Sequence, residues 1–323
     1  MQDDTSTAPK RRRGRDRGHE VNVDLIAVLV AVTNGQPCVL TIDRARALPS
    51  GPFELSHRSL QSGLRVWVEQ QTDHPLGYVE QLYTFADRDR MGDERAPRVV
   101  SISYLGLTRE EDTEHSINRG WFSWYDYFPW EDHRTGVPSI IPSVVGPKLG
   151  AWAEHAGGAG ARSGRWQRAA IAFGFDEREW NEELVLQRYE LLYEAGLVEE
   201  ALRGSDAAKA PPLPGRPMVA DHRRILATGI ARLRTKIKYR PVVFELMPPA
   251  FTLLQLQRTV EALAGRLVHK QNFRRLIEQQ ELVEETGETT SDTRGRPAKL
   301  FRFRHAVLAE RSAAGTKLPL MRA

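Results

Sequence analysis

The chain has 323 residues, of which 41% are hydrophobic and 27% charged, enough for about two folded domains with buried cores. Its single cysteine, Cys38, excludes an intramolecular disulfide and a cysteine-based metal site, so we expect a reducing, cytoplasmic location. No apolar run approaches the ~20 residues of a membrane span, and residues 1–20 lack the apolar core of a secretory signal.

The first twenty residues are polar, and six lysine and arginine side chains stand between positions 10 and 17. Such a run either binds a phosphate backbone or is a solvated tail, and we expect a disordered basic tail over residues 1–20. A second tail is expected at residues 311–323. The net charge of the whole chain, +4, permits a nucleic-acid partner without requiring one.

From position 21 the pattern becomes that of a folded domain. Buried strands are predicted at residues 23–32 and 37–43, a helix at 58–70, and further strands at 78–85 and 98–107. The last of these is apolar on both faces, which indicates a central position in a sheet. The order strand, strand, helix, strand, strand describes an α+β domain.

Residues 110–217 have a different composition. Six of the seven tryptophans lie between Trp121 and Trp180, and residues 121–130 read WFSWYDYFPW. We predict a folded insertion that contains a helix at about 176–195 and has the aromatic side chains as its core. An interface or a surface that stacks a base is the alternative.

A second domain is predicted at residues 241–310, after an amphipathic connecting helix at 219–239 that Pro241 ends. Its first helix starts at the capping residue Thr252 and stops at Gly265. A short turn, a second helix at 270–280 and two strands at 281–286 and 298–303 follow. This order is the winged helix-turn-helix arrangement.

The segment from Gly51 to Thr72 resembles the Nudix hydrolase signature, which reads Gly, five residues, Glu, seven residues, then Arg-Glu-apolar-x-Glu-Glu-x-Gly-apolar. Four positions keep the required residue type: Gly51, Arg65, Trp67 and Glu69. Four positions depart from it: His57, Val66, Gln70 and Thr72. On this stretch alone, a chance match is an equal alternative.

The departures remove most of the acids of the box. Nudix chemistry holds a divalent metal against a diphosphate, and magnesium requires several anionic oxygen ligands. This box keeps a single carboxylate, so we expect no catalytic residue, no metal site and no cofactor. We instead expect a ligand-binding role for His57, Arg65 and Glu69, and an ion pair between Arg65 and Glu69 one helical turn apart.

Two longer stretches strengthen the resemblance. LGYVEQLYTFADRDR followed by RVVSISYLGL, and the C-terminal pattern NFRR…TGE…GRPAKLFRF, are similar to the Nudix-type transcriptional regulators of bacterial NAD metabolism, the NrtR/NadQ-like group. The resemblance covers residues 21–109 and 219–304, and the altered box and the insertion look most like its NadQ-type members. It implies a Nudix-like α/β/α sandwich that senses a nucleotide, followed by a winged helix that binds an operator. His269 departs from the acid usual before the second helix.

The charges of the second domain support a DNA-binding role. Basic residues gather on its second helix and on its hairpin, the elements that face DNA in a winged helix. Arginine suits guanine edges, and asparagine and glutamine suit adenine. The predicted DNA contacts are Lys270, Gln271, Asn272, Arg274, Arg275, Arg294, Arg296 and Lys299. A winged helix that binds protein is the alternative.

The sequence as a whole therefore predicts a ligand-responsive repressor of NAD biosynthesis genes. We expect a homodimer on double-stranded operator DNA, with an adenine nucleotide such as ATP, ADP-ribose or an NAD-like molecule as effector. One alternative is a Nudix pyrophosphatase with an appended winged-helix module, because acids outside the box could supply metal ligands: Glu54, Asp87, Asp89 and Glu94. A nucleic-acid adaptor without a small ligand is the other.

Overall fold

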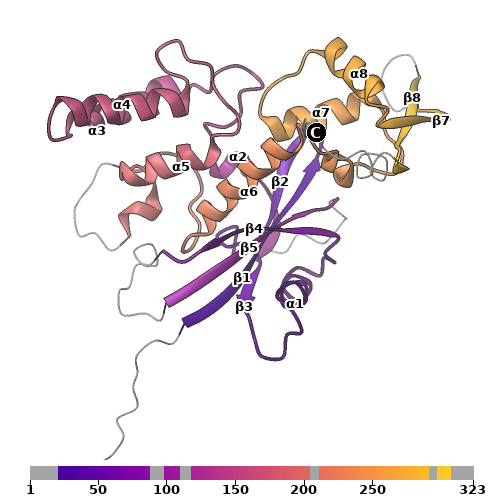
Figure 1. Cartoon of the computed structure of the whole chain (residues 1–323), viewed down its shortest axis with the longest axis horizontal. Helices are drawn as coiled ribbons and strands as arrows, with labels where there is room; N and C mark the ends of the chain where they lie inside the picture. Colours follow the sequence, from indigo (N-terminus) through magenta and orange to yellow (C-terminus); the bar gives the residue numbers. More distant parts are fainter. Residues whose placement is uncertain (1–20, 88–97, 110–117, 204–210, 291–296, 307–323) are drawn as a thin grey trace, which may run out of the picture.

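A six-stranded mixed sheet lies at the centre of the structure (Figure 1). The computed structural model describes residues 21–87, 98–109, 118–203, 211–290 and 297–306, so both predicted tails lie outside the described residues. Along the sheet the strands follow the order β4-β5-β1-β2-β6, and β3 pairs with β1. The strands are β1 (Val21–Thr33), β2 (Gln36–Ile42), β3 (Ser50–Pro52), β4 (Tyr78–Phe85), β5 (Arg98–Leu107) and β6 (Arg119–Ser123).

The predicted central position of residues 98–107 is confirmed. β5 pairs in parallel with β1, from Val21 opposite Arg98 to Val30 opposite Leu107, and its other edge pairs antiparallel with β4. A strand with partners on both edges and helices on both faces has no solvated side, which explains its continuous apolar run.

The long strand β1 shows how the layers arise. Side chains alternate between the two faces of a strand, and every residue from Leu25 to Ala31 is buried. The odd-numbered residues from Leu25 to Leu29 pack with α1 (Leu60–Thr72), and the even-numbered ones belong to the core that includes α6 (His222–Lys236). The two helices therefore lie on opposite sides of the sheet (Figure 1), and the predicted α+β class with an α/β/α sandwich is confirmed.

The first element of the predicted insertion is a strand of the central sheet. β6 pairs antiparallel with β2, with Trp121 opposite Leu40, so the aromatic run begins as a sheet strand. Helices follow: α2 (Trp124–Tyr127), a π-helical turn η2 (Ile141–Val145), α3 (Gly146–Glu154), α4 (Ala159–Phe173), α5 (Val185–Glu194) and the 3₁₀ turn η3 (Glu199–Leu202).

The prediction of one helix over 176–195 was wrong for its first half. Asp176 and Glu177 have φ angles of 55° and 63°, a left-handed backbone that interrupts any helix, and α5 starts only at Val185. Trp180 lies in the irregular segment between Glu177 and the start of α5. Its ring stacks on the His133 ring, with ring centroids 3.9 Å apart. The helical spacing of Trp180 with the apolar residues of α5 was therefore coincidental.

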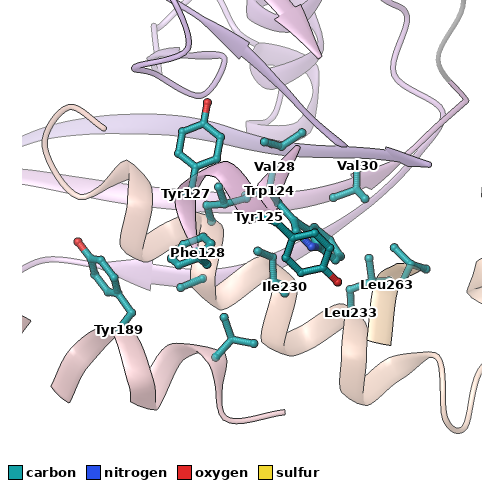
Figure 2. Close-up of a cluster of buried hydrophobic side chains, with 14 of the residues drawn as sticks. Val28, Val30, Trp124, Tyr125, Tyr127, Phe128, Tyr189, Ile230, Leu233 and Leu263 are labelled. Carbon is teal, nitrogen blue, oxygen red and sulfur yellow. The ribbon is translucent and has the colours of Figure 1, made fainter. Parts of the chain in front are cut away.

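The aromatic run forms core, as predicted. Trp124, Tyr127, Phe128 and Trp130 are each at most 1% exposed. Figure 2 shows aromatic side chains of this run between β1 residues such as Val28 and the connecting helix α6. The cluster therefore joins the sheet to the helices that follow it in the chain.

The second domain has the predicted winged-helix elements. Thr252 and Gln255 form a reciprocal capping box at the start of the first helix, and Gly265 ends it with φ 71°, as the sequence predicted. The hairpin strand β7 extends four residues beyond the predicted strand. The elements are η4 (Val242–Leu246), α7 (Leu253–Ala264), α8 (Lys270–Gln279), β7 (Val283–Thr290) and β8 (Ala298–Phe303).

The first helix of the winged-helix region packs directly on the sheet. α7 contacts β1, β2 and α6, and its buried Leu263 belongs to the same cluster as Val30 and Leu233 (Figure 2). The last carbonyls of α7 accept hydrogen bonds from the preceding region: Tyr125 Oη donates to Ala262 O at 2.7 Å, and the His133 N–H donates to Gly265 O at 2.7 Å. The two regions therefore share one core. Every helix in the described residues is too short or too polar to span a membrane.

A buried carboxylate lies where these regions meet. Glu131 accepts hydrogen bonds from Arg188 of α5 at 2.5 Å and from Arg234 of α6 at 2.6 Å, and all three side chains are at most 1% exposed. Arg234 Nε also donates to Leu263 O of α7 at 2.9 Å. Burial raises the pKa of Glu131, but the two guanidinium groups outweigh it and hold the pKa below its ordinary value.

Replacing Glu131 tests this arrangement. Glu131→Gln leaves the buried cations Arg188 and Arg234 without a counter-charge, and we expect a loss of about 3–5 kcal/mol in the free energy of unfolding. Urea denaturation followed by circular dichroism measures it. The control is Glu154→Gln, whose exposed pair with Arg162 has a separation of 3.4 Å and should contribute less than about 1 kcal/mol. Equal effects of the two substitutions would contradict the role of Glu131.

A buried histidine predicts a dependence of stability on pH. His222 Nδ1 accepts the Leu48 N–H at 2.9 Å, and burial, together with the charge of Arg203, lowers the His222 pKa from 6.5 to about 4. The unfolded chain binds a proton below pH 6.5 and the folded one does not, so folding stability is lost as pH falls from 6.5 towards 4.

We expect this histidine to account for about 3 kcal/mol of that loss. His222→Asn keeps an acceptor for the backbone N–H but does not titrate, so its free energy of unfolding should fall less steeply over the same pH range. The exposed His155, replaced by asparagine, is the control. Parallel curves for wild type and His222→Asn would rule out this explanation.

Candidate functional site

The loop and helix that resemble the Nudix box keep the box's frame. α1 begins with a reciprocal capping box between Ser59 and Ser62. A Cβ added at Gly51 would lie 2.3 Å from the Trp67 ring, so only glycine allows the loop to approach the helix this closely. The indole N–H of Trp67 donates to Pro52 O at 2.9 Å. The retained glycine and tryptophan therefore hold the loop against the helix by packing.

His57 stands where the signature has its first glutamate, and its ring accepts a hydrogen bond from the backbone of the preceding loop. His57 Nδ1 accepts the Glu54 N–H at 3.0 Å, and a Cβ added at Gly63 would come within 2.6 Å of the same nitrogen. The half-buried ring also meets Trp67 edge-on. Only Nε2 is left among the ring nitrogens to meet a ligand.

The predicted ion pair between Arg65 and Glu69 does not form. Arg65 donates instead to two consecutive carbonyl oxygens after α1, those of Leu76 and Gly77, the latter at 3.2 Å. The planar guanidinium fork suits two neighbouring acceptors, and it thereby fixes the chain between α1 and β4. Glu69 is exposed and has no ion-pair partner among the described residues.

The acids that could supply metal ligands are dispersed. Within the described ranges, no three His, Cys, Asp or Glu side chains lie close enough together to hold a metal ion. Asp87 pairs with Arg224 of α6, and Glu54 accepts a hydrogen bond from Ser56 at 3.3 Å. The other two predicted acids, Asp89 and Glu94, lie outside the described residues.

The second helix of the winged-helix region, α8, has two distinct sides. The apolar spacing of the sequence predicts that Phe273, Leu276 and Ile277 hold the helix to the core. Phe273 and Ile277 are buried, but for Leu276 this prediction is wrong, since its side chain is 49% exposed at the edge of a cavity. The exposed residues Lys270, Gln271, Arg274 and Arg275 lie next to one another at helical spacing and form a basic face. No side chain caps the helix at His269, in agreement with the missing acid there.

Asn272 lies at the edge of this basic face, three residues before Arg275. With Leu276 and Gln280, four and eight residues on, it lines a cavity between α8 and the end of α6. Asn272 is exposed and lies at the border between the basic face and the cavity, so its contact with DNA stays a prediction.

The hairpin is less positive than the basic residues of β8 and the preceding loop indicate, because acids of β7 pair with two of them. Lys299 Nζ donates to both carboxylate oxygens of Glu285, at 2.8 and 2.9 Å, and Arg302 pairs with Glu284 at 2.6 Å. The predicted contacts Arg294 and Arg296 lie outside the described residues. Both acids stand on β7, so a count of charges along β8 and the loop before it leaves them out.

Comparisons with known proteins match this geometry. Residues 243–303 match the family model of the NrtR DNA-binding winged helix domain. The chain is 40% identical over 83 residues to the "ADPR responsive transcriptional repressor NtrR" of Acinetobacter baylyi. That match covers 26% of this chain and 33% of the relative, so the chain spans only a third of the curated relative's length.

Two solved structures share the overall fold. Shewanella oneidensis NrtR in complex with a 27mer DNA has a TM-score of 0.53 at 20% identity, and the match covers 89% of this chain and 95% of that one. A MutT/nudix family protein from Enterococcus faecalis has a TM-score of 0.51 at 16% identity, with coverage of 93% and 90%. The chain is thus similar to NrtR in its winged helix domain, at residues 243–303, and it shares the overall fold of the NrtR structure.

Proposed function

We propose that this protein is a ligand-responsive transcriptional repressor whose winged helix binds double-stranded operator DNA. The observation that carries the proposal is the basic face of α8, formed by Lys270, Gln271, Arg274 and Arg275 on a helix that Phe273 and Ile277 attach to the core. The name of the A. baylyi relative, an "ADPR responsive transcriptional repressor", supports the same function. Two half-sites need two recognition helices, so the active form is a homodimer.

The effector is an adenine nucleotide bound by the Nudix-type domain. Among ATP, ADP-ribose and NAD-like molecules, the relative's name favours ADP-ribose, and genes of NAD biosynthesis are the corresponding targets. His57 Nε2 and the exposed Glu69 border the candidate site on the loop and α1. Arg65 has a structural role, because it donates hydrogen bonds to two backbone carbonyl oxygens beyond the helix.

The nucleotide is bound without being hydrolysed. The box keeps only one carboxylate, Glu69, and Val66 offers neither a metal ligand nor a base. The described residues include no cluster of acids that could replace those ligands. The packing of Gly51 against Trp67 needs no metal, so the fold of the site survives the loss of the acids.

The connecting helix α6 transmits ligand binding to the DNA-binding region. Its Lys236 pairs with Glu80 on the edge strand β4, and its Arg234 reaches both Glu131 and the end of α7. A ligand that favours one position of α6 therefore favours one position of α7. The ligand shifts the equilibrium between these two helix positions by as much as its affinity differs between them, and repression changes accordingly.

Substitutions on α8 test the DNA-binding face. An operator duplex is first selected from random sequence with the full chain. We expect Arg274→Ala and Arg275→Ala each to weaken its binding by about 1–3 kcal/mol, if that arginine reads a base. Lys270→Ala should instead weaken all duplexes alike and reduce the salt slope by about one, as a phosphate contact does.

Fluorescence anisotropy at several salt concentrations measures both effects. Arg162→Ala, which removes an exposed arginine from α4, is the matched control and should leave DNA affinity unchanged. Full affinity in a variant that lacks Lys270, Arg274 and Arg275 together would mean that α8 is not the DNA-binding element.

Nucleotide binding is tested by thermal shift with ADP-ribose, ATP and NAD. A ligand at 100 times its Kd stabilises the folded state by about 2.7 kcal/mol, so the true effector should raise the Tm clearly. Chromatography after incubation with magnesium or manganese should recover the ADP-ribose intact. Turnover that Glu69→Gln abolishes would establish the pyrophosphatase alternative instead.

A further inference from the structure

A cavity of about 760 Å³ lies between the end of α6, the turn that joins α7 to α8, and the side of α8 that faces away from its basic residues. Its volume is within the range of small-molecule sites in proteins. None of the residues of the altered Nudix box lines it, so it is separate from the candidate nucleotide site.

The walls of this cavity are mostly apolar, and the apolar residues at its edge are unusually exposed. Tyr239 at the end of α6 is 55% exposed, Leu267 in the turn is 62% exposed, and Leu276 of α8 is 49% exposed. Below them the buried Phe273 and Ile277 form the floor. Large apolar side chains gathered around one hollow indicate a surface that a ligand or partner covers.

The rim of the cavity is basic. Lys238, Arg240 and Arg266 lie on it, and Glu182 is the acid that faces them. Glu182 accepts from Lys238 at 2.8 Å and lies 3.4 Å from Arg266, and the neighbouring Glu183 also pairs with Lys238, at 2.5 Å. Arg240 is exposed and has no ion-pair partner in the part of the chain that the structure describes. The rim therefore carries a surplus of positive charge above an apolar floor.

We propose that this cavity is a second small-molecule site, which binds an organic anion with an apolar body. The apolar part lies against Leu267, Leu276 and Phe273, and the anionic group meets Arg240. A highly charged, polar nucleotide does not suit these walls, because it would leave its polar groups against apolar side chains. The occupant is thus chemically different from the effector of the Nudix-type domain.

The site lies behind the proposed recognition helix. Asn272, Leu276 and Gln280 line the cavity from α8, while Arg274 lies on the opposite side of the same helix. An occupant that contacts both helices therefore changes the position of α8 relative to α6, and through it the binding of DNA. Only this consequence depends on the proposed function, since occupancy of the cavity can be measured without DNA.

The test uses the fluorescent probe 8-anilinonaphthalene-1-sulfonate, an apolar body with one anionic group, titrated into the full chain. We expect saturable binding at one site per chain. Leu267→Glu places a negative charge at the mouth and should weaken binding at least about tenfold, and Arg240→Gln should weaken it by about tenfold. Both residues are exposed, so neither substitution disturbs the core. Val137→Glu, at an exposed valine away from the cavity, should leave the affinity unchanged.

The same titration can overturn the proposal. Binding that does not saturate, or that Leu267→Glu and Arg240→Gln leave unchanged, would mean that the probe lies elsewhere. Binding that occurs only when the protein is diluted to a monomer would identify the cavity as an interface between two copies of the chain. If the probe binds as expected but DNA affinity does not change on saturation, the site stands and its regulatory consequence fails.

Discussion

The arrangement of this molecule depends on one buried carboxylate. Glu131 follows the aromatic run and is held between Arg188 of α5 and Arg234 of α6, with almost no exposure to water. An ion buried in this way is tolerated only where its partners are placed accurately, because the cost of removing the charges from water is several kcal/mol per ion. Since Arg234 also binds the Leu263 carbonyl, the same contact fixes the first helix of the winged-helix region.

This constraint limits how the proposed response to a ligand can reach the winged-helix region. The winged-helix region is packed against the sheet, because α7 contacts β1 and β2. The carbonyl oxygens at the end of α7 also accept hydrogen bonds from Tyr125 and His133. Under the proposed function, ligand binding would therefore reach the winged-helix region as a small shift of packed helices. Such shifts are typical where interfaces have discrete alternative packings. The helix α6, which contacts β4 through Lys236 and α7 through Arg234, is placed to undergo one.

The altered box shows that a fold and its chemistry rest on different residues. Gly51 and Trp67 are kept in place by steric fit, and the turn after α1 by the carbonyl contacts of Arg65. None of these contacts needs a metal. Val66 and Gln70 can therefore replace acids without loss of the helix or the loop, and a binding surface can persist where a hydrolytic one does not.

The sequence by itself determined what short-range physics controls. The strand at 98–107, the aromatic core and the caps of α7 at Thr252 and Gly265 could be predicted, because apolar periodicity and capping depend on nearby residues. The resemblance to the regulators added the order of the two domains.

Only the tertiary structure decided the contacts between distant segments. It gave Arg65 the carbonyls of Leu76 and Gly77 in place of Glu69, set Asn272 at the border between the basic face and the cavity, and brought Glu131 between two arginines far along the chain. The physical reason is that a charged or amide side chain can choose among many partners of similar energy. Which of them is near depends on how the layers pack, and no local pattern in the sequence records that.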